Sequence, residues 1–154
     1  MTLAEWLLFL HILFGITWVG GTIMLQVLGF RASRSGDPKQ TVEFLGTADF
    51  AGRYVFNVAG ILTAAFGIWL VIDSDFIGFD EAWISFALTI VIISALLGMF
   101  FFGPQAKKAM AIAEERGPED AEFGSLMQRI MVVSQVELVL LLAVVWAMVF
   151  KPGA

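Results

Sequence analysis

The sequence contains no cysteine and only one histidine, His11, among its 154 residues. Without thiols the chain has no disulfides, thiolate metal sites, iron–sulfur clusters or thiol catalysis. A single imidazole also excludes a metal cage of several histidines within one chain. Most of the side chains on which metal and nucleophilic catalysis depend are therefore missing.

Charge is scarce as well. Only 15% of the residues are charged, 59% are hydrophobic, and the mean hydropathy is +0.87. Soluble domains carry about 25% charged residues, because a polar surface must cover the core. This chain cannot supply that surface, which argues against a soluble globule and equally against a disordered chain. A net charge of −5 argues against a nucleic-acid partner.

Long apolar runs are what the sequence does contain. A helix needs about 20 apolar residues to cross a hydrocarbon core of roughly 30 Å. Four stretches meet this condition: residues 3–30, 54–72, 83–102 and 130–150. They are too long for strands and show no sustained alternation. We predict an all-α protein, a four-helix transmembrane bundle that takes up residues 1–154 as a single domain in the lipid bilayer.

The charges predict the orientation of these spans. Lys and Arg are retained in cytoplasmic connections, and eight of the nine basic residues flank the first and third connections. The second connection, residues 73–82, holds four acidic residues and no basic one. We therefore expect a multi-pass protein of the cell (plasma or inner) membrane with both termini outside. Tryptophan favours the headgroup level, and four tryptophans fall at the outer ends of the spans: Trp6, Trp69, Trp83 and Trp146.

The predicted cytoplasmic connections carry helix signals. The run Asp37–Gln40 combines an N-cap, a proline at the first helical position and a capping-box glutamine, which predicts a short helix from Pro38 towards Gly46. The third helix should continue into the cytoplasm as far as Arg116, because Gly117-Pro118 then ends it. The fourth helix should begin near Pro118, well before it enters the membrane.

An ionisable group inside a membrane is costly and is a functional candidate by default. Two such residues lie deep in the spans, His11 and Glu137. At 1.5 Å per residue their depths differ by less than about 10 Å, so a contact between them, direct or through water, is within reach. Arg53 is an alternative partner for Glu137.

Helical spacing arranges these groups in stripes. His11, Gly15 and Trp18 continue at spacings of three and four to Thr22 and Gln26. A second stripe runs from Arg53 and Asn57 through small residues that allow close helix approach. We expect the two stripes to face each other, and Trp18 to pack inside the bundle.

On the fourth helix Ser134 and Glu137 share a face, whereas Gln135 points elsewhere. The candidates for a proton or substrate path are Glu137, Arg53, Asn57, Gln26 and Gln135. Each polar residue also has a structural interpretation. His11 can serve as a hydrogen-bond donor between helices, Glu137 can be a neutral hydrogen-bonded carboxyl, and the amides can join helices.

The first span also carries a family resemblance. Its pattern Leu10-His11, six residues, then Trp18-Val19-Gly20-Gly21 resembles bacterial CopD-like copper-resistance proteins. It resembles most closely a related family of about this length, described as predicted integral membrane proteins of unknown function. HemJ-type protoporphyrinogen oxidases begin with a similar helix, but their Pro-Arg pair and second histidine are missing here. The resemblance implies that His11 is a ligand of haem b or copper, with Trp18, Gly20 and Gly21 as its packing neighbours. Gly15 and Trp18, on the same stripe as His11, are expected beside the bound group.

Three functions remain open at this point. The first is a haem- or metal-binding protein linked to redox chemistry or metal handling, in which a second haem ligand comes from another protomer or is absent. The second is a small proton-coupled transporter or permease that works as a homodimer, with His11, Glu137, Arg53 and Asn57 at its core. The third is a non-catalytic membrane subunit. An enzyme is less expected, because the sequence has no nucleophile elbow, P-loop or HExxH motif.

Overall fold

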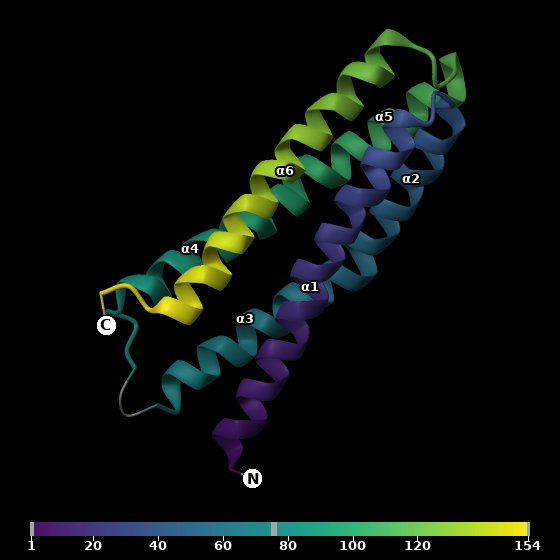
Figure 1. Ribbon diagram of the computed structural model, residues 1–154. Helices are drawn as coiled ribbons and strands as arrows, with labels where there is room; N and C mark the ends of the chain where they lie inside the picture. Colours follow the sequence, from purple (N-terminus) through teal and green to yellow (C-terminus); the bar gives the residue numbers. More distant parts are fainter. Residues whose placement is uncertain (1, 75–76, 154) are drawn as a thin grey trace.

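A computed structural model describes residues 2–74 and 77–153, and no strand occurs in this part of the chain. The chain forms four long helical rods joined by short connections (Figure 1). The first rod is α1 (Leu3–Arg34) and the fourth is α6 (Ala121–Phe150). The second consists of α2 (Pro38–Phe50), the π-helical segment η1 (Ala51–Phe56) and α3 (Asn57–Ile72). The third consists of α4 (Ala82–Leu97), the π-helical segment η2 (Gly98–Phe102) and α5 (Gly103–Arg116).

The four rods confirm the predicted spans. Each is long and apolar enough to cross a membrane. Many of their large apolar side chains point away from the bundle, including Ile61, Phe100 and Val139, which are at least 65% exposed. Exposed apolar surface of this extent is expected where lipid surrounds a protein. Backbone groups within helices are already paired, so the rods can enter hydrocarbon without unsatisfied polar groups.

Local capping fixes several helix ends as predicted. The Asp37 side chain accepts a hydrogen bond from the Lys39 amide at 3.0 Å, and Pro38 occupies the first helical turn. Gly117 ends α5 with a φ of 89°, a conformation that favours glycine. The third rod therefore runs beyond the apolar segment to Arg116, as expected.

Two predicted boundaries are wrong. No short helix ends near Gly46, because α2 continues through η1 into α3 as one rod. A glycine inside a helix costs only about 1 kcal/mol, and the adjacent Leu45 is 2% exposed in a packed cluster, so tertiary packing carries the helix through. The fourth rod begins at Ala121 rather than near Pro118, because Asp120 is its N-cap and accepts from the Glu122 amide at 2.8 Å.

The rods pack as two pairs, α1 with α3 and α4 with α6 (Figure 1). One hydrophobic cluster joins α2, α5 and α6 and includes the buried residues Leu45, Ala109 and Phe123. A smaller cluster at the other end centres on Trp83, Ile84 and Ala147. Trp83 is thus buried, whereas Trp6, Trp69 and Trp146 are about half exposed at that end.

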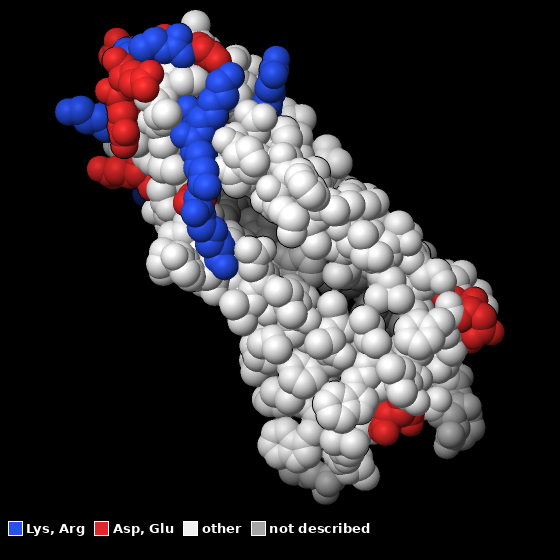
Figure 2. All heavy atoms as spheres, turned by 180° about the vertical axis from the view of Figure 1, so that it is seen from behind, with Lys and Arg blue, Asp and Glu red and all other residues white. Residues whose placement is uncertain are grey.

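Charged side chains gather at the two ends of the molecule, with basic and acidic ones mixed at one end and acidic ones at the other (Figure 2). The basic end is defined by the connections α1–α2 and α5–α6 and carries Arg31, Arg34, Lys39, Arg53, Lys107, Lys108, Arg116 and Arg129. The acidic end holds the start of α1, the end of α6 and the α3–α4 connection, with Glu5, Asp73, Asp80 and Glu81. Between the two ends, residues 6–30, 54–72, 82–106 and 130–150 contain a single residue of the Asp, Glu, Lys and Arg classes, Glu137. The assignment of the basic end to the cytoplasm stays a prediction.

Candidate functional site

A hydrogen bond between two polar side chains joins α1 to α6 inside the apolar part of the bundle. The Gln26 amide nitrogen Nε2 donates to the Ser134 hydroxyl at 2.8 Å, and that hydroxyl donates to the Met131 carbonyl oxygen at 3.0 Å. Both side chains are partly buried. The hydroxyl therefore acts as donor and acceptor at once, which satisfies it in a medium without water.

Glu137 lies one turn from Ser134 on the same helix. Its carboxyl group lies near the Ser94 side chain of α4. Ser94 is 5% exposed, and Glu137 is partly buried. The carboxyl group is therefore directed between helices and away from the surrounding lipid, which is the arrangement expected for an ionisable residue in a membrane.

Asn57, in the second rod, is the next polar residue near Glu137 and Ser94. A Cβ atom at Gly98 would lie 3.9 Å from the Asn57 oxygen Oδ1, and Gly98 is one turn from Ser94. Asn57 on α3 is exposed, and its side chain lies close to Gly98 on the third rod. We call these residues the polar layer, to which all four rods contribute: Gln26, Asn57, Ser94, Ser134 and Glu137.

Both π-helical segments adjoin the polar layer. η1 ends at Phe56, next to Asn57, and η2 begins at Gly98. A π-helical turn holds an extra residue and shifts the side chains that follow, and such turns are common at functional sites. Here they lie in two rods that are otherwise α-helical, beside Asn57 and Gly98.

His11 has a separate environment between α1 and α3. Its Nδ1 atom lies 2.8 Å from the Thr63 carbonyl oxygen. The ring rests on Gly67, where a Cβ atom would come within 2.8 Å of Cε1 and 3.0 Å of Nδ1. Because a carbonyl oxygen only accepts, Nδ1 carries a proton and donates to it. Nε2 has no hydrogen-bond partner among the described residues.

Comparison with known proteins identifies one family. The family described as predicted integral membrane protein, DUF2269, matches residues 5–152. The chain belongs to this family. No curated protein and no solved structure matches it.

Membership in DUF2269 confirms the predicted resemblance to a family of integral membrane proteins. Together with the four long apolar helices, it identifies the chain as an integral membrane protein. The family has no assigned function. The finer likeness to CopD-like and HemJ-type proteins is not supported by the match and stays a prediction.

The predicted contact between His11 and Glu137 is not formed in this DUF2269 protein. Gln26 faces Ser134, and the missing Cβ of Gly29 would meet the Met131 sulfur at 3.0 Å. In this antiparallel register Glu137 is level with residue 23, so His11 lies about 18 Å nearer the acidic end. The sequence prediction measured the depth of each residue from the end of its own apolar span. It missed the difference of about 18 Å because the rods do not begin at the same level.

Arg53 is not a partner of Glu137 either. Its guanidinium donates to Asp49, one turn earlier, at 2.8 and 2.9 Å. Local i, i+4 pairs of this kind form readily on helix surfaces. Arg53 therefore belongs to the basic end and lies outside the polar layer.

The prediction that the stripes of α1 and α3 face each other is confirmed where a glycine of one helix lies against a larger side chain of the other. A Cβ atom at Gly60 would lie 3.6 Å from the Trp18 ring, and one at Gly15 would lie 3.8 Å from the Thr63 methyl group. Trp18 therefore packs inside the bundle as expected. Asn57, at the end of its stripe, is exposed and lies near Gly98 of the third rod. Gln135 points outward, as its position on the helix predicted, and makes no contact with the polar layer.

Ser94 was missed by the sequence analysis. A serine in an apolar helix usually bonds its own backbone, so nothing singled it out from Ser85 or Thr89. The only local signal is its spacing from Gly98, which places a small polar residue and a glycine on one face. Its proximity to Glu137 depends on packing between rods, which the periodicity of one helix does not specify.

The His11 site offers a metal only one ligand from this chain. In residues 2–74 and 77–153 no group of three or more His, Cys, Asp or Glu side chains could hold a metal ion. The predicted neighbours Gly15 and Trp18 pack along the same α1–α3 contact and supply no donor atom. A metal or haem would therefore need further ligands from elsewhere.

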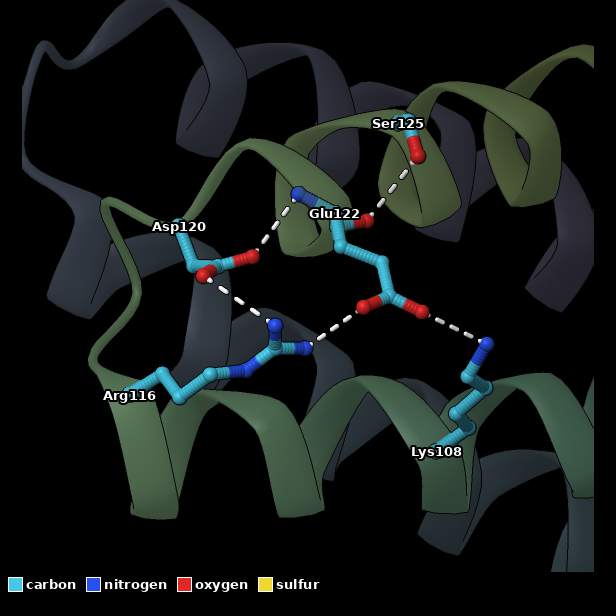
Figure 3. Close-up of polar contacts among 5 residues, drawn as sticks. All are labelled: Lys108, Arg116, Asp120, Glu122 and Ser125. Atoms are coloured by element: carbon cyan, nitrogen blue, oxygen red, sulfur yellow. Dashed lines mark hydrogen bonds and ion pairs between the residues drawn. The ribbon is translucent and has the colours of Figure 1, made fainter.

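A second polar cluster, at the basic end, joins α5 to α6 (Figure 3). Glu122 pairs with Arg116 at 2.6 Å and with Lys108 at 2.7 Å, and Arg116 also lies 3.5 Å from Asp120. Hydrogen bonds from Arg116 and Lys108 lower the pKa of Glu122 to about 2. These exposed ion pairs fix the turn between the third and fourth rods, outside the apolar segment.

Proposed function

We propose that this protein is a small proton-coupled carrier in which Glu137 takes up and releases the proton. One observation carries the proposal. Glu137 is the only Asp, Glu, Lys or Arg in residues 6–30, 54–72, 82–106 and 130–150, and its partly buried carboxyl group lies near Ser94 of α4. Carboxyl groups in such positions commonly mark proton and ion pathways.

The neighbours of Glu137 suit a group that changes its protonation state. The nearby Ser94 hydroxyl can donate to a carboxylate and accept from a carboxylic acid, so it suits both protonation states of Glu137. Gln26 and Ser134 lie one turn nearer the basic end and extend the row of polar atoms in that direction. A proton would therefore enter from the basic end, which we expect to be cytoplasmic.

The architecture supports a movement that exposes the site. The rods form two pairs, and a π-helical segment adjoins the polar layer in one rod of each pair. Relative motion of packed helices is a common way to open a buried site. Four helices leave little room for a private pathway, so we propose that the carrier works as a homodimer in the cell membrane.

Proton flux into proteoliposomes tests this function. An enclosed pH dye should report faster equilibration of an imposed pH gradient with the protein than without it. Glu137→Gln should reduce flux to the rate of empty liposomes, because the amide cannot bind and release a proton. Gln135→Leu is the matched control and should keep the wild-type rate, since Gln135 points outward on the same helix. Equal rates for Glu137→Gln and wild type would remove the proposal.

A second candidate rests on His11. The hydrogen bond from Nδ1 to the Thr63 carbonyl orients the ring and leaves Nε2 free, which is how ligating histidines are commonly held. His11 fits haem b or copper as one ligand, with a further ligand from a second protomer or an open position. Such a group would supply redox chemistry, while His11 and Thr63 would only bind and orient it.

Absorption spectroscopy and metal analysis of the detergent-purified protein test this candidate. A Soret band or bound copper that disappears in His11→Ala would support it. A wild-type sample with no Soret band, iron or copper would end it.

A further inference from the structure

The basic end carries positive side chains that the protein itself does not neutralise. Arg53, Lys108 and Arg116 form ion pairs with Asp49, Asp120 and Glu122. Among the described residues the other basic side chains at this end have no acidic partner within ion-pair distance: Arg31, Arg34, Lys39, Lys107 and Arg129. All five are exposed.

Three of these residues lie at the border of the apolar body. Each of them directly adjoins one of the long apolar runs 6–30, 82–106 and 130–150: Arg31 in α1, Lys107 in α5 and Arg129 in α6. Arg31 and Arg129 also share one level, because they follow the antiparallel register set by Gln26 with Ser134. We call these three residues the basic collar.

The collar points outward from the bundle. Its neighbours Ala32, Ala106 and Met127 are buried on the inner faces of the same helices, whereas Arg31, Lys107 and Arg129 are exposed. The collar therefore lies on the outer surface of three of the four rods, where lipid surrounds an integral membrane protein.

Acidic residues at the basic end lie mainly farther from the apolar body. Glu114, Glu115 and Glu119 follow Lys107 towards the tip of the α5–α6 turn. Figure 2 shows red side chains gathered at this tip, while blue ones reach from it towards the white apolar body. Positive side chains that have no acidic partner are thus found next to the hydrocarbon boundary, while the tip carries both signs.

We propose that the basic collar binds the phosphate groups of anionic phospholipids at the membrane surface. Basic residues directly beside a transmembrane segment attract anionic headgroups, and a guanidinium matches phosphate oxygens in a two-pronged geometry. The outward direction and the position beside the uncharged runs favour a headgroup over a soluble anion. This inference is independent of the proton-carrier proposal.

Native mass spectrometry of the purified protein in mixed micelles tests it. With equal amounts of phosphatidylglycerol and phosphatidylcholine, the wild type should retain phosphatidylglycerol preferentially. The triple variant Arg31→Gln, Lys107→Gln, Arg129→Gln should lose this preference. Lys151→Gln, which removes a basic residue at the acidic end, should keep it. An unchanged preference in the triple variant would overturn the proposal.

Two further measurements keep the test decisive. If the triple variant does not fold, Arg129→Gln alone should still reduce the preference, and added salt should reduce it in the wild type because headgroup attraction is screened. Neither reduction would be expected if the collar bound no lipid. Inorganic phosphate at the same concentration as the lipid should not displace phosphatidylglycerol, and displacement would assign the collar to a soluble anion.

Discussion

Gly67 determines where the His11 ring can lie. In Gly67→Ala the new Cβ would come 2.8 Å from Cε1 and 3.0 Å from Nδ1, so the ring must shift away from the Thr63 carbonyl. Overpacking of this kind typically costs about 1–3 kcal/mol. We expect a lower free energy of unfolding in detergent, measured by denaturant titration.

Gly20→Ala is the control for that measurement. No atom lies within 4 Å of the Cβ it would add, and alanine is the better helix former, so its stability should equal or exceed that of the wild type. If Gly67→Ala were as stable as Gly20→Ala, the close packing of His11 against α3 would be wrong.

Single residues show how far sequence reasoning extends into the site. Glu137, Gln26 and Asn57 could be predicted because polar groups stand out in apolar runs. Their partners Ser94 and Gly98 could not, since contacts between rods depend on tilt and register. The same limit explains why His11 and Glu137, which seemed close in depth, bond to different helices.

At the scale of helical elements, the Glu122 cluster links α5 to α6 in a pH-dependent manner. Its ion pairs lower the pKa of Glu122 from an ordinary value of 4.5 to about 2. The folded state therefore favours the carboxylate, and this stabilisation is fully present above pH 4.5. As the pH falls from 4.5 through about 2, the carboxylate is protonated and the stabilisation is lost. Because the groups are exposed, the effect is small.

Thermal melting at a series of pH values tests this link. The wild type should melt at a higher temperature than Glu122→Gln at neutral pH, and the difference should vanish between pH 4.5 and 2. Glu119→Gln serves as the control, since Glu119 forms no ion pair with the described residues, and its melting should follow the wild type. A difference for Glu122→Gln that persists to pH 2 would contradict the assigned ion pairs.

Helical elements were predictable where their signals are local. Span length, the Asp37 cap and the Gly117 stop all depend on a few neighbouring residues. The continuation of α2 past Gly46 was not predictable, because it depends on the burial of Leu45 against α5 and α6. The π-helical segments were not predicted either, since they follow from how whole rods pack.

At the scale of the whole molecule, the orientation in the membrane is open to direct test. The chain has no native cysteine, so single cysteines can be introduced at Lys39 near the basic end and Phe79 near the acidic end, both exposed. A membrane-impermeant maleimide applied to intact cells should label Phe79→Cys. It should label Lys39→Cys only after the membrane is opened. The reverse pattern would invert the predicted topology.

The proposed carrier needs lipid around its four rods and water that reaches Ser94 and Glu137 from within when the buried site opens. In the structure Ser94 is 5% exposed and Ile92, on the same helix, is 60% exposed. The most direct measurement is the rate at which a small water-soluble thiosulfonate modifies Ser94→Cys and Ile92→Cys in the membrane. We predict that Ser94→Cys reacts and Ile92→Cys does not, because Ile92 faces lipid. If Ile92→Cys reacted faster than Ser94→Cys, as its larger exposed fraction alone would suggest, lipid would not surround this face of α4.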